Sequence, residues 1–164
     1  MVVDDGSDDG TDEAALRWKE RLKGAVLTVF RQPHAGAGAA RNRALKEAKT
    51  EFVAFLDADD EWLPAKLERS MAAIRDTEYV LVAHDSWQVE DGDEVRIGSA
   101  RRFRAGKASP FVALYRRGFI DTSTVVARRD AVCSEGGFDT TLANAQDFEL
   151  WLALLRRPET KFHV

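Results

Sequence analysis

Short apolar segments alternate with helical stripes through the first half of the sequence, and this alternation restricts the fold more than any other feature. Apolar runs at residues 25–30, 52–56 and 79–83 are short, rich in β-branched or aromatic residues, and bounded by polar residues. These properties are typical of buried strands. Apolar residues recur at helical spacing in residues 11–22, 38–49 and 63–74. Strands that alternate with helices of this length predict an α/β domain with a parallel sheet.

Each helical stripe is expected to pack against the core, because one apolar face of an amphipathic helix seeks burial. The predicted faces are Ala15, Trp18 and Leu22 in the first helix, and Leu63, Leu67, Met71 and Ile74 in the third, with Pro64 in its first turn.

The second half follows a different pattern. Residues 86–90 and 94–103 flank Asp91-Gly92, which predicts an antiparallel hairpin with a tight turn. A helix over 109–116, a strand over 122–127 and a last helix over 146–157 are expected after it. No repeat or linker divides the chain, so residues 1–164 are expected to form one domain.

Acidic residues follow two of the predicted strands. Asp4-Asp5 come after the first apolar residues, and Asp57, Asp59 and Asp60 come after the run at 52–56. Ligands of parallel α/β sheets bind beyond the carboxyl ends of the strands, so both groups are expected at one sheet edge. A D-x-D turn suits Mg2+ or Mn2+, with coordination sites left for phosphate oxygens. The alternative interpretation of such a turn is a solvated acidic loop.

Charge and composition restrict the classes of molecule that the chain can bind. The net charge of −4 argues against nucleic acid as a partner. No apolar run reaches the roughly 20 residues needed to cross a bilayer, so a cytoplasmic location is expected. The basic cluster Arg101, Arg102, Arg104 and Lys107 is interpreted as a solvated face. The alternative for this cluster is peripheral contact with the inner face of an anionic membrane or with a phosphorylated lipid acceptor.

A phospho-receiver domain is a rival interpretation from another functional class. Asp4-Asp5, Asp57 and Lys107 mimic its acidic pair, phosphoacceptor and lysine. The spacing disagrees, because Pro64 falls seven residues after Asp57 and Lys107 is followed by alanine. This function is therefore the less favoured one.

Five short motifs occur in order along nearly the whole chain. They are VVDDGSDDGT at 2–11, Gly36 with Ala40-Arg41-Asn42, FVAFLDADDEWLP at 52–64, Gly137-Phe138-Asp139 and QDFELW at 146–151. Together these motifs resemble family-two glycosyltransferases of the GT-A fold.

The resemblance implies a GT-A-like (Rossmann-like) fold, with a mostly parallel sheet flanked by helices and an antiparallel hairpin insertion. It implies a nucleotide-binding part over about 1–78 and an acceptor and catalytic part over about 79–164. Complete members of the family carry a further strand and helix before this region, so the chain is expected to be truncated at both ends. An open sheet edge would then favour weak nucleotide affinity or pairing of two copies.

The resemblance also assigns the nucleotide and metal residues. Asp5 corresponds to the carboxylate that hydrogen-bonds the base, usually uracil. Asp57 and Asp59 correspond to the D-x-D pair, the first near the ribose and the second at Mn2+ or Mg2+, and Asp60 extends the pair at the metal. Arg41 corresponds to a residue near the nucleotide.

Asp147 corresponds to the catalytic base of the family. That base normally follows a glutamate, and Gln146 stands in the glutamate's place. The implied reaction is metal-dependent transfer of a sugar from a nucleotide diphosphate donor, UDP-linked, to a hydroxyl of a saccharide, lipid or protein acceptor, with inversion. The alternative function is a non-catalytic, nucleotide-sugar-binding remnant.

Overall fold

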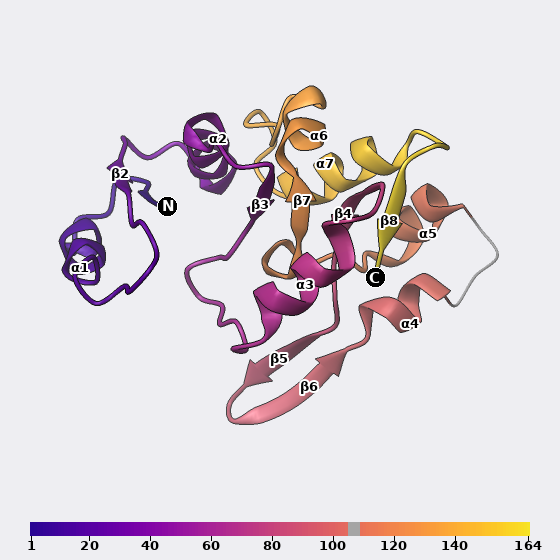
Figure 1. Cartoon of the computed structure of the whole chain (residues 1–164), viewed down its shortest axis with the longest axis horizontal. Coiled ribbons are helices and arrows are strands. Elements are labelled where there is room, and N and C mark those ends of the chain that lie inside the picture. The colour runs from indigo at the N-terminus through magenta and orange to yellow at the C-terminus, as the bar shows by residue number, and fades with distance from the viewer. Residues whose placement is uncertain (105–108) are drawn as a thin grey trace.

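A computed structural model of the chain describes residues 1–104 and 109–164 (Figure 1). The strands are β1 (Val2–Asp4), β2 (Val29–Arg31), β3 (Phe52–Ala54), β4 (Tyr79–Val82), β5 (Ser86–Glu90), β6 (Asp93–Ile97), β7 (Val126–Arg128) and β8 (Lys161–His163). The α-helices are α1 (Thr11–Arg17), α2 (Ala37–Glu47), α3 (Lys66–Ile74), α4 (Ser99–Arg104), α5 (Pro110–Arg117), α6 (Arg129–Ser134) and α7 (Gln146–Leu155), and η1 (Thr122–Thr124) is a 3-10 helix.

The central sheet has the order β3-β7-β4-β8. Strands β3, β4 and β8 run in one direction, because β7 is antiparallel to both β3 and β4 and β4 is parallel to β8. Strands β1 and β2 form a separate parallel pair. In Figure 1 this pair lies with α1 at one end of the molecule, next to α2, and the β5–β6 hairpin projects from the body.

The strand register assigns the two faces of the sheet. Leu81 pairs with Ala127, and both belong to the main core, which also contains buried residues of α5, α6 and α7. The next pair, Val82 and Val126, packs with Ile74 of α3 instead. Successive strand residues point to opposite faces. Helices therefore cover both faces, as the predicted α/β class requires.

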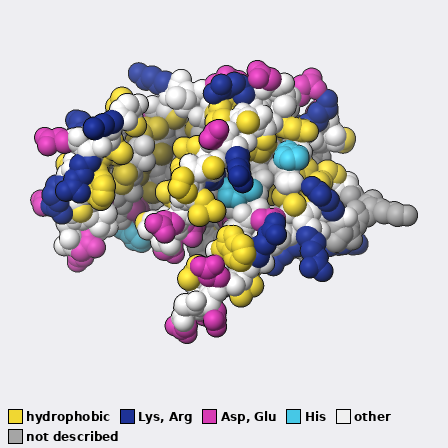
Figure 2. All heavy atoms as spheres, turned by 60° about the horizontal axis from the view of Figure 1, so that its bottom comes forward, with side chains coloured by type: hydrophobic (Ala, Val, Ile, Leu, Met, Phe, Trp, Pro, Cys, Tyr) yellow, Lys and Arg dark blue, Asp and Glu magenta, His cyan; other side chains and the backbone are white. Residues whose placement is uncertain are grey.

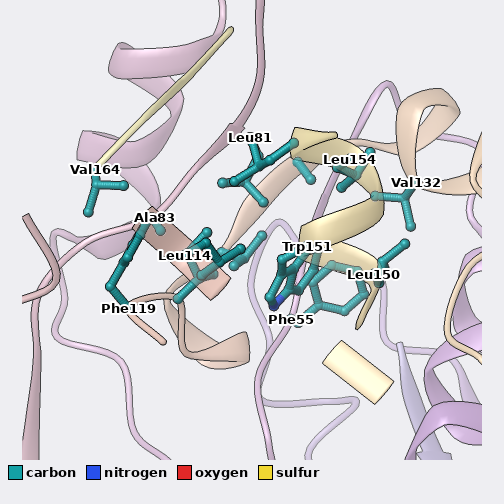
Figure 3. Close-up of a cluster of buried hydrophobic side chains, with 14 of the residues drawn as sticks. Phe55, Leu81, Ala83, Leu114, Phe119, Val132, Leu150, Trp151, Leu154 and Val164 are labelled. Atoms are coloured by element: carbon teal, nitrogen blue, oxygen red, sulfur yellow. The ribbon is translucent and has the colours of Figure 1, made fainter. Parts of the chain in front are cut away.

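The main core is built around Trp151 of α7, which is fully buried. Its ring lies 5.9 Å from the rings of Phe55 and Phe138, which approach each other edge to face at 5.4 Å. Figure 3 shows Trp151 next to Phe55, with Leu150 and Leu154 on the same helix. Aromatic residues from three sequence motifs thus pack together.

The predicted strand over 94–103 is wrong in its second half. Strand β6 ends at Ile97, and residues 99–104 form α4. Asp85 explains the difference, because its carboxylate accepts the N–H of Ala100 and so satisfies a donor in the first turn of the helix. The two residues are far apart in the sequence, so no local pattern reveals the contact.

The predicted strand over 122–127 is also shorter than expected. Residues 122–124 form η1, and β7 covers only Val126–Arg128. Thr124 stabilises the turn by donating its hydroxyl to the carbonyl of Asp121 at 2.6 Å.

Two predicted helical faces are wrong in part. Helix α1 ends at Arg17 and buries no residue, and Trp18 and Leu22 are exposed. Helix α3 starts at Lys66, so Pro64 precedes it, and Leu63 and Leu67 are exposed. Met71 and Ile74 do pack on the sheet. Among the described residues, none of the helices is both long and apolar enough to cross a membrane.

Candidate active site

The carboxylate of Asp5 lies at the start of α2. It accepts hydrogen bonds from the backbone N–H groups of Ala35 (3.1 Å) and Gly36 (2.7 Å) and from Gln32 Nε2 (2.7 Å). Partial burial opposes ionisation, but these hydrogen bonds outweigh it and lower the pKa of Asp5 below its ordinary value. Asp5 is therefore a fixed anion that ties the end of β1 to α2.

A hollow of about 430 Å³ lies beside Asp5, lined by Gly6, Arg31, Gln32 and Pro33. It is a shallow depression that is open to solvent. Gln32 lines the hollow and also donates to Asp5, so this carboxylate contacts the wall of the hollow.

Arg41 and Asp57 form an ion pair between α2 and the loop after β3. Arg41 Nη2 lies 2.5 Å from Asp57 Oδ1, and the guanidinium lies over the ring of Phe138, 5.3 Å from its centre. The backbone N–H of Asp57 donates to Ser123 Oγ at 2.9 Å. A cation this close disfavours a metal ion at Asp57. This is consistent with the predicted place of Asp57 near the ribose.

Asp59 and Asp60 lie in the loop after β3, and both are exposed. The N–H of Asp60 donates to the carbonyl of Asp57 at 3.2 Å, which turns the loop. Within residues 1–104 and 109–164, no ion pair or hydrogen bond occupies either carboxylate, and no three metal-binding side chains gather. Such a pair fits a divalent ion held by one or two carboxylates and completed by phosphate oxygens and water.

Asp147 lies in the first turn of α7 and is half-buried. Thr122 Oγ1 of η1 donates a hydrogen bond to Asp147 Oδ2 at 2.7 Å. The neighbouring Ser123 accepts the N–H of Asp57. The predicted base and the predicted donor loop are therefore joined by two consecutive residues.

Gln146 is accommodated by two contacts. Its Nε2 donates to the carbonyl of Leu142 at 2.7 Å. A Cβ placed on Gly38 would lie 2.3 Å from Gln146 Oε1, so the side chain rests directly on this glycine of α2. A carboxylate at position 146 could not donate to Leu142. The amide thus has a structural reason where the family pattern has glutamate.

Other residues of the five motifs maintain the packing. The Asn42 side chain donates to the carbonyl of Phe138 (2.7 Å) and accepts its N–H (2.8 Å), which joins α2 to the Gly137-Phe138 segment. Trp151, the last residue of the QDFELW motif, is fully buried and belongs to the core.

The candidate carboxylates do not form a single cluster. No hydrogen bond joins Asp5 to Asp57 or Asp147 in the described parts of the chain. Helix α2 connects them instead, because Asp5 binds the residues at its start and Arg41 pairs with Asp57 one turn later. Lys107, used in the receiver interpretation and in the predicted basic cluster, lies outside the described residues.

Sequence reasoning missed Thr122, Ser123 and Lys66. Lys66 is buried, lies 4.1 Å from the centre of the Trp62 ring, and donates to the carbonyl of Val125 at 3.4 Å. Trp62 in turn donates its indole N–H to the carbonyl of Ser123 at 2.8 Å. The only signal in the sequence is the polar run Asp-Thr-Ser-Thr before an apolar segment, which is weak alone.

Comparison with known proteins decides the family. The sequence model described as Glycosyl transferase family 2 matches residues 1–136, which is most of the chain. The chain belongs to glycosyl transferase family 2. The match includes Asp5, Arg41, Asp57, Asp59 and Asp60, and it ends before Asp147.

Family members that resemble this chain include bacterial biosynthetic proteins. A putative teichuronic acid biosynthesis glycosyltransferase, TuaG of Bacillus subtilis, is 28% identical over 99% of this chain and 62% of its own length. The amylovoran biosynthesis glycosyltransferase AmsB of Erwinia amylovora is 28% identical over 100% of this chain and 59% of its own length. The chain thus spans about three fifths of the length of these curated relatives.

A solved structure shares the fold. The mannosyltransferase PcManGT from Pyrobaculum calidifontis, in complex with GDP-Man and Mn2+, superimposes with a TM-score of 0.68 over 99% of this chain and 44% of that chain, at 21% identity. The predicted GT-A-like α/β class of this family 2 member is therefore confirmed.

Proposed function

We propose that this chain is the catalytic core of an enzyme that transfers a sugar from a nucleotide diphosphate donor, UDP-linked, to an acceptor hydroxyl, with inversion. One observation carries the proposal. Thr122 and Ser123 hold the Asp147 carboxylate and the backbone of Asp57, so the proposed base and donor loop share one support. The family supplies the reaction class.

Asp147 is the proposed general base. It accepts the proton of the acceptor hydroxyl while the acceptor oxygen forms a bond to the anomeric carbon. The bond from that carbon to the diphosphate oxygen breaks at the same time, and its electron pair leaves with the diphosphate. Attack from the face opposite the leaving group inverts the anomeric centre.

Asp59 and Asp60 are the proposed residues for Mn2+ or Mg2+. When bound, the ion would offset negative charge on the leaving diphosphate as a Lewis acid. Asp57, held by Arg41, is proposed to orient the ribose, and Asp5 to contact the base from the hollow beside it. PcManGT, described in complex with GDP-Man and Mn2+, supports a divalent ion in this fold.

The relatives also support a lipid-linked acceptor. Escherichia coli WfgD, a UDP-Glc:alpha-D-GlcNAc-diphosphoundecaprenol beta-1,3-glucosyltransferase, is 29% identical over 95% of this chain and 57% of its own length. Its name includes a UDP-linked donor and a diphosphate-linked lipid acceptor, and both chemistries are part of the proposal.

Calorimetry and a turnover assay test the donor site. Titration with UDP and Mn2+ should give binding that Asp59→Asn and Asp60→Asn each weaken roughly tenfold, because each loses one carboxylate ligand. Asp76→Asn is the matched control, since Asp76 is an exposed aspartate at the end of α3. Release of UDP from UDP-glucose should fall about 10²–10⁴-fold in Asp147→Asn.

The outcomes separate the candidate functions. Binding that depends on Asp59, without turnover of UDP-glucose, UDP-N-acetylglucosamine or GDP-mannose, would favour the nucleotide-sugar-binding module over the enzyme. Equal losses of affinity for UDP and Mn2+ in Asp59→Asn and Asp76→Asn would contradict the proposed metal site. Retention of the anomeric configuration, read by NMR, would contradict inversion.

The proposal includes contact with an anionic membrane through α4 and α5. Every charged residue between Glu94 and Asp121 is Lys or Arg. Exposed Arg101, Arg104 and Arg116 lie with exposed Tyr115 on these two helices, and Figure 2 shows basic side chains gathered over this side. Arginine near an anionic surface contributes on the order of 1 kcal/mol per residue, and tyrosine suits the interface.

Flotation with vesicles measures this contact. Vesicles of phosphatidylcholine with about one third phosphatidylserine should carry the chain, and the R101E/R104E variant should stay unbound. Arg43→Glu, on α2, is the control for charge reversal elsewhere. Equal flotation with pure phosphatidylcholine would contradict an electrostatic surface.

A further inference from the structure

We propose that Thr122 is the positioning residue for the base of this active site, an inference that rests on the proposed function. Thr122 is 4% exposed, and its hydroxyl donates to Asp147 Oδ2 at 2.7 Å. Hydrogen bonds to a charged acceptor are roughly twice as strong as neutral ones. This contact fixes both the side-chain rotamer and the plane of the carboxylate.

The hydrogen bond from Thr122 leaves the second carboxylate oxygen of Asp147, Oδ1, available to accept a proton. Within residues 1–104 and 109–164, no side chain or backbone group donates to Asp147 Oδ1. A carboxylate that is held at one oxygen and open at the other can accept a proton from a bound hydroxyl without reorienting. A general base needs this placement within hydrogen-bond reach of the proton it removes.

Thr122 is itself held on both sides. The carbonyl of Asp121 accepts the Thr124 hydroxyl at 2.6 Å and the Thr124 N–H at 3.0 Å, which closes η1. The Asp121 carboxylate accepts the hydroxyl of Ser86 at the start of the β5–β6 hairpin, 2.7 Å away. The position of Thr122 is therefore set by the turn and by the hairpin beside it.

The next residue connects this support to the donor loop. Ser123 Oγ accepts the N–H of Asp57 at 2.9 Å, and its carbonyl accepts the indole N–H of Trp62 at 2.8 Å. The two ends of the Asp57 to Trp62 loop thus contact one residue. Since Thr122 and Ser123 are consecutive, η1 sets the distance between the proposed base and the proposed donor carboxylates. Transfer requires both halves in one geometry.

Three threonine variants test the role. The Thr122→Val variant keeps the shape of the side chain and removes the donor, whereas Thr122→Ser keeps the donor. The Thr77→Val variant is the matched control, because the half-buried Thr77 lies after α3, outside the proposed site, and its hydroxyl donates to the carbonyl of Ile74 at 2.9 Å instead of Asp147. Each protein is assayed for release of nucleoside diphosphate from the best of UDP-glucose, UDP-N-acetylglucosamine and GDP-mannose, with Mn2+ and with water as the acceptor. Water then supplies the hydroxyl that attacks the anomeric carbon and the proton that Asp147 accepts.

We expect Thr122→Val to lower kcat about tenfold or more, with the donor KM and the Kd for UDP and Mn2+ within about twofold of wild type. Thr122→Ser should recover kcat to within about threefold. Thr77→Val should change kcat less than Thr122→Val at an equal loss of Tm. This split between kcat and KM, with rescue by serine, is not expected from a threonine that only stabilises the fold.

Three outcomes would overturn the inference. One is a kcat of Thr122→Val equal to that of Thr77→Val at matched Tm, and another is a loss confined to donor KM. The third is failure of Thr122→Ser to recover kcat while its Tm is that of wild type. If Asp147→Asn turns over the donor as fast as wild type, or wild type releases no diphosphate, the proposed function itself fails and the role of Thr122 fails with it.

Discussion

The two ends of the proposed site are built on different kinds of scaffold. Asp147 lies on α7, whose Leu150, Trp151 and Leu154 are buried in the main core. Asp5 follows β1, in a two-stranded parallel pair beside α1, a helix that buries no residue. Asp147, the proposed catalytic base, is therefore placed by packing, whereas Asp5, the proposed nucleobase contact, is placed by hydrogen bonds to the start of α2.

The difference indicates which part of the chain opens locally at the lower cost in free energy. Four apolar residues in the region of α1 are exposed, namely Leu16, Trp18, Leu22 and Val26, and α1 buries none of its residues. Leu56, Leu63 and Leu67 beside the central sheet are exposed too, but the interior of that sheet is closed by helices on both faces. Local opening is easiest where few apolar contacts are buried. The β1–β2 pair and α1, which carry Asp5, are thus expected to open locally more readily than the central sheet, next to which Asp57 and η1 lie.

Two tryptophan substitutions would show the difference most strongly. Trp151→Ala removes a fully buried ring packed on Phe55 and Phe138, and should lower the free energy of unfolding by about 3–5 kcal/mol. Trp18→Ala, at a residue 57% exposed, should change it by no more than about 0.5 kcal/mol. Denaturant unfolding followed by circular dichroism measures both. Similar losses in the two variants would contradict the contrast between scaffolds.

Much of the central sheet could be predicted from the sequence, because β3 and β4 are apolar runs flanked by polar residues. The η1 turn could not, since Thr122 and Thr124 are β-branched and precede apolar residues, as in a strand. Its conformation depends on contacts such as Ser123 with Asp57, 66 residues away. The same limit applies to α4, which Asp85 stabilises from outside the local sequence.

The proposed site carboxylates rest on two kinds of sequence signal. Asp5, Asp57, Asp59 and Asp60 follow predicted strands, and the family resemblance assigns their roles and that of Asp147, so these roles stay predictions. The contacts that support them have no such signal. The Arg41–Asp57 pair and the Thr122–Asp147 bond join segments whose proximity depends on the complete fold.

Titration of Lys66 would sharpen the comparison in the packed region. Burial lowers its pKa to about 8 from 10.5. Between these two values the unfolded chain keeps a proton that the folded chain releases, so the free energy of unfolding should rise with pH in this window. The variant Lys66→Met should lack this slope, and Lys46→Met, at an exposed lysine of α2, should keep it. Equal slopes in Lys66→Met and wild type would show that the nearby Trp62 ring compensates for burial.

Titration of Asp5 should have the opposite pH dependence and the smallest, most local effect. Its folded pKa lies below the ordinary 3.8, so its contribution to stability is complete above that value and is lost as the pH falls through the folded pKa. Protection of the Gly36 amide against hydrogen exchange should be lower in Asp5→Asn than in wild type at pH 7. The two proteins should converge as the pH falls through the folded pKa of Asp5.

The matched control for Asp5 is Asp8→Asn, at an exposed aspartate in the same region. It should leave the Gly36 amide unchanged, and the amide of Leu81 in the central sheet should exchange equally slowly in all three proteins. Loss of protection at Leu81 in Asp5→Asn would mean that the two scaffolds open together. In that case hydrogen bonding at the start of α2 would stabilise the central sheet as well. The distinction between Asp147, placed by packing, and Asp5, placed by hydrogen bonds, would then be wrong.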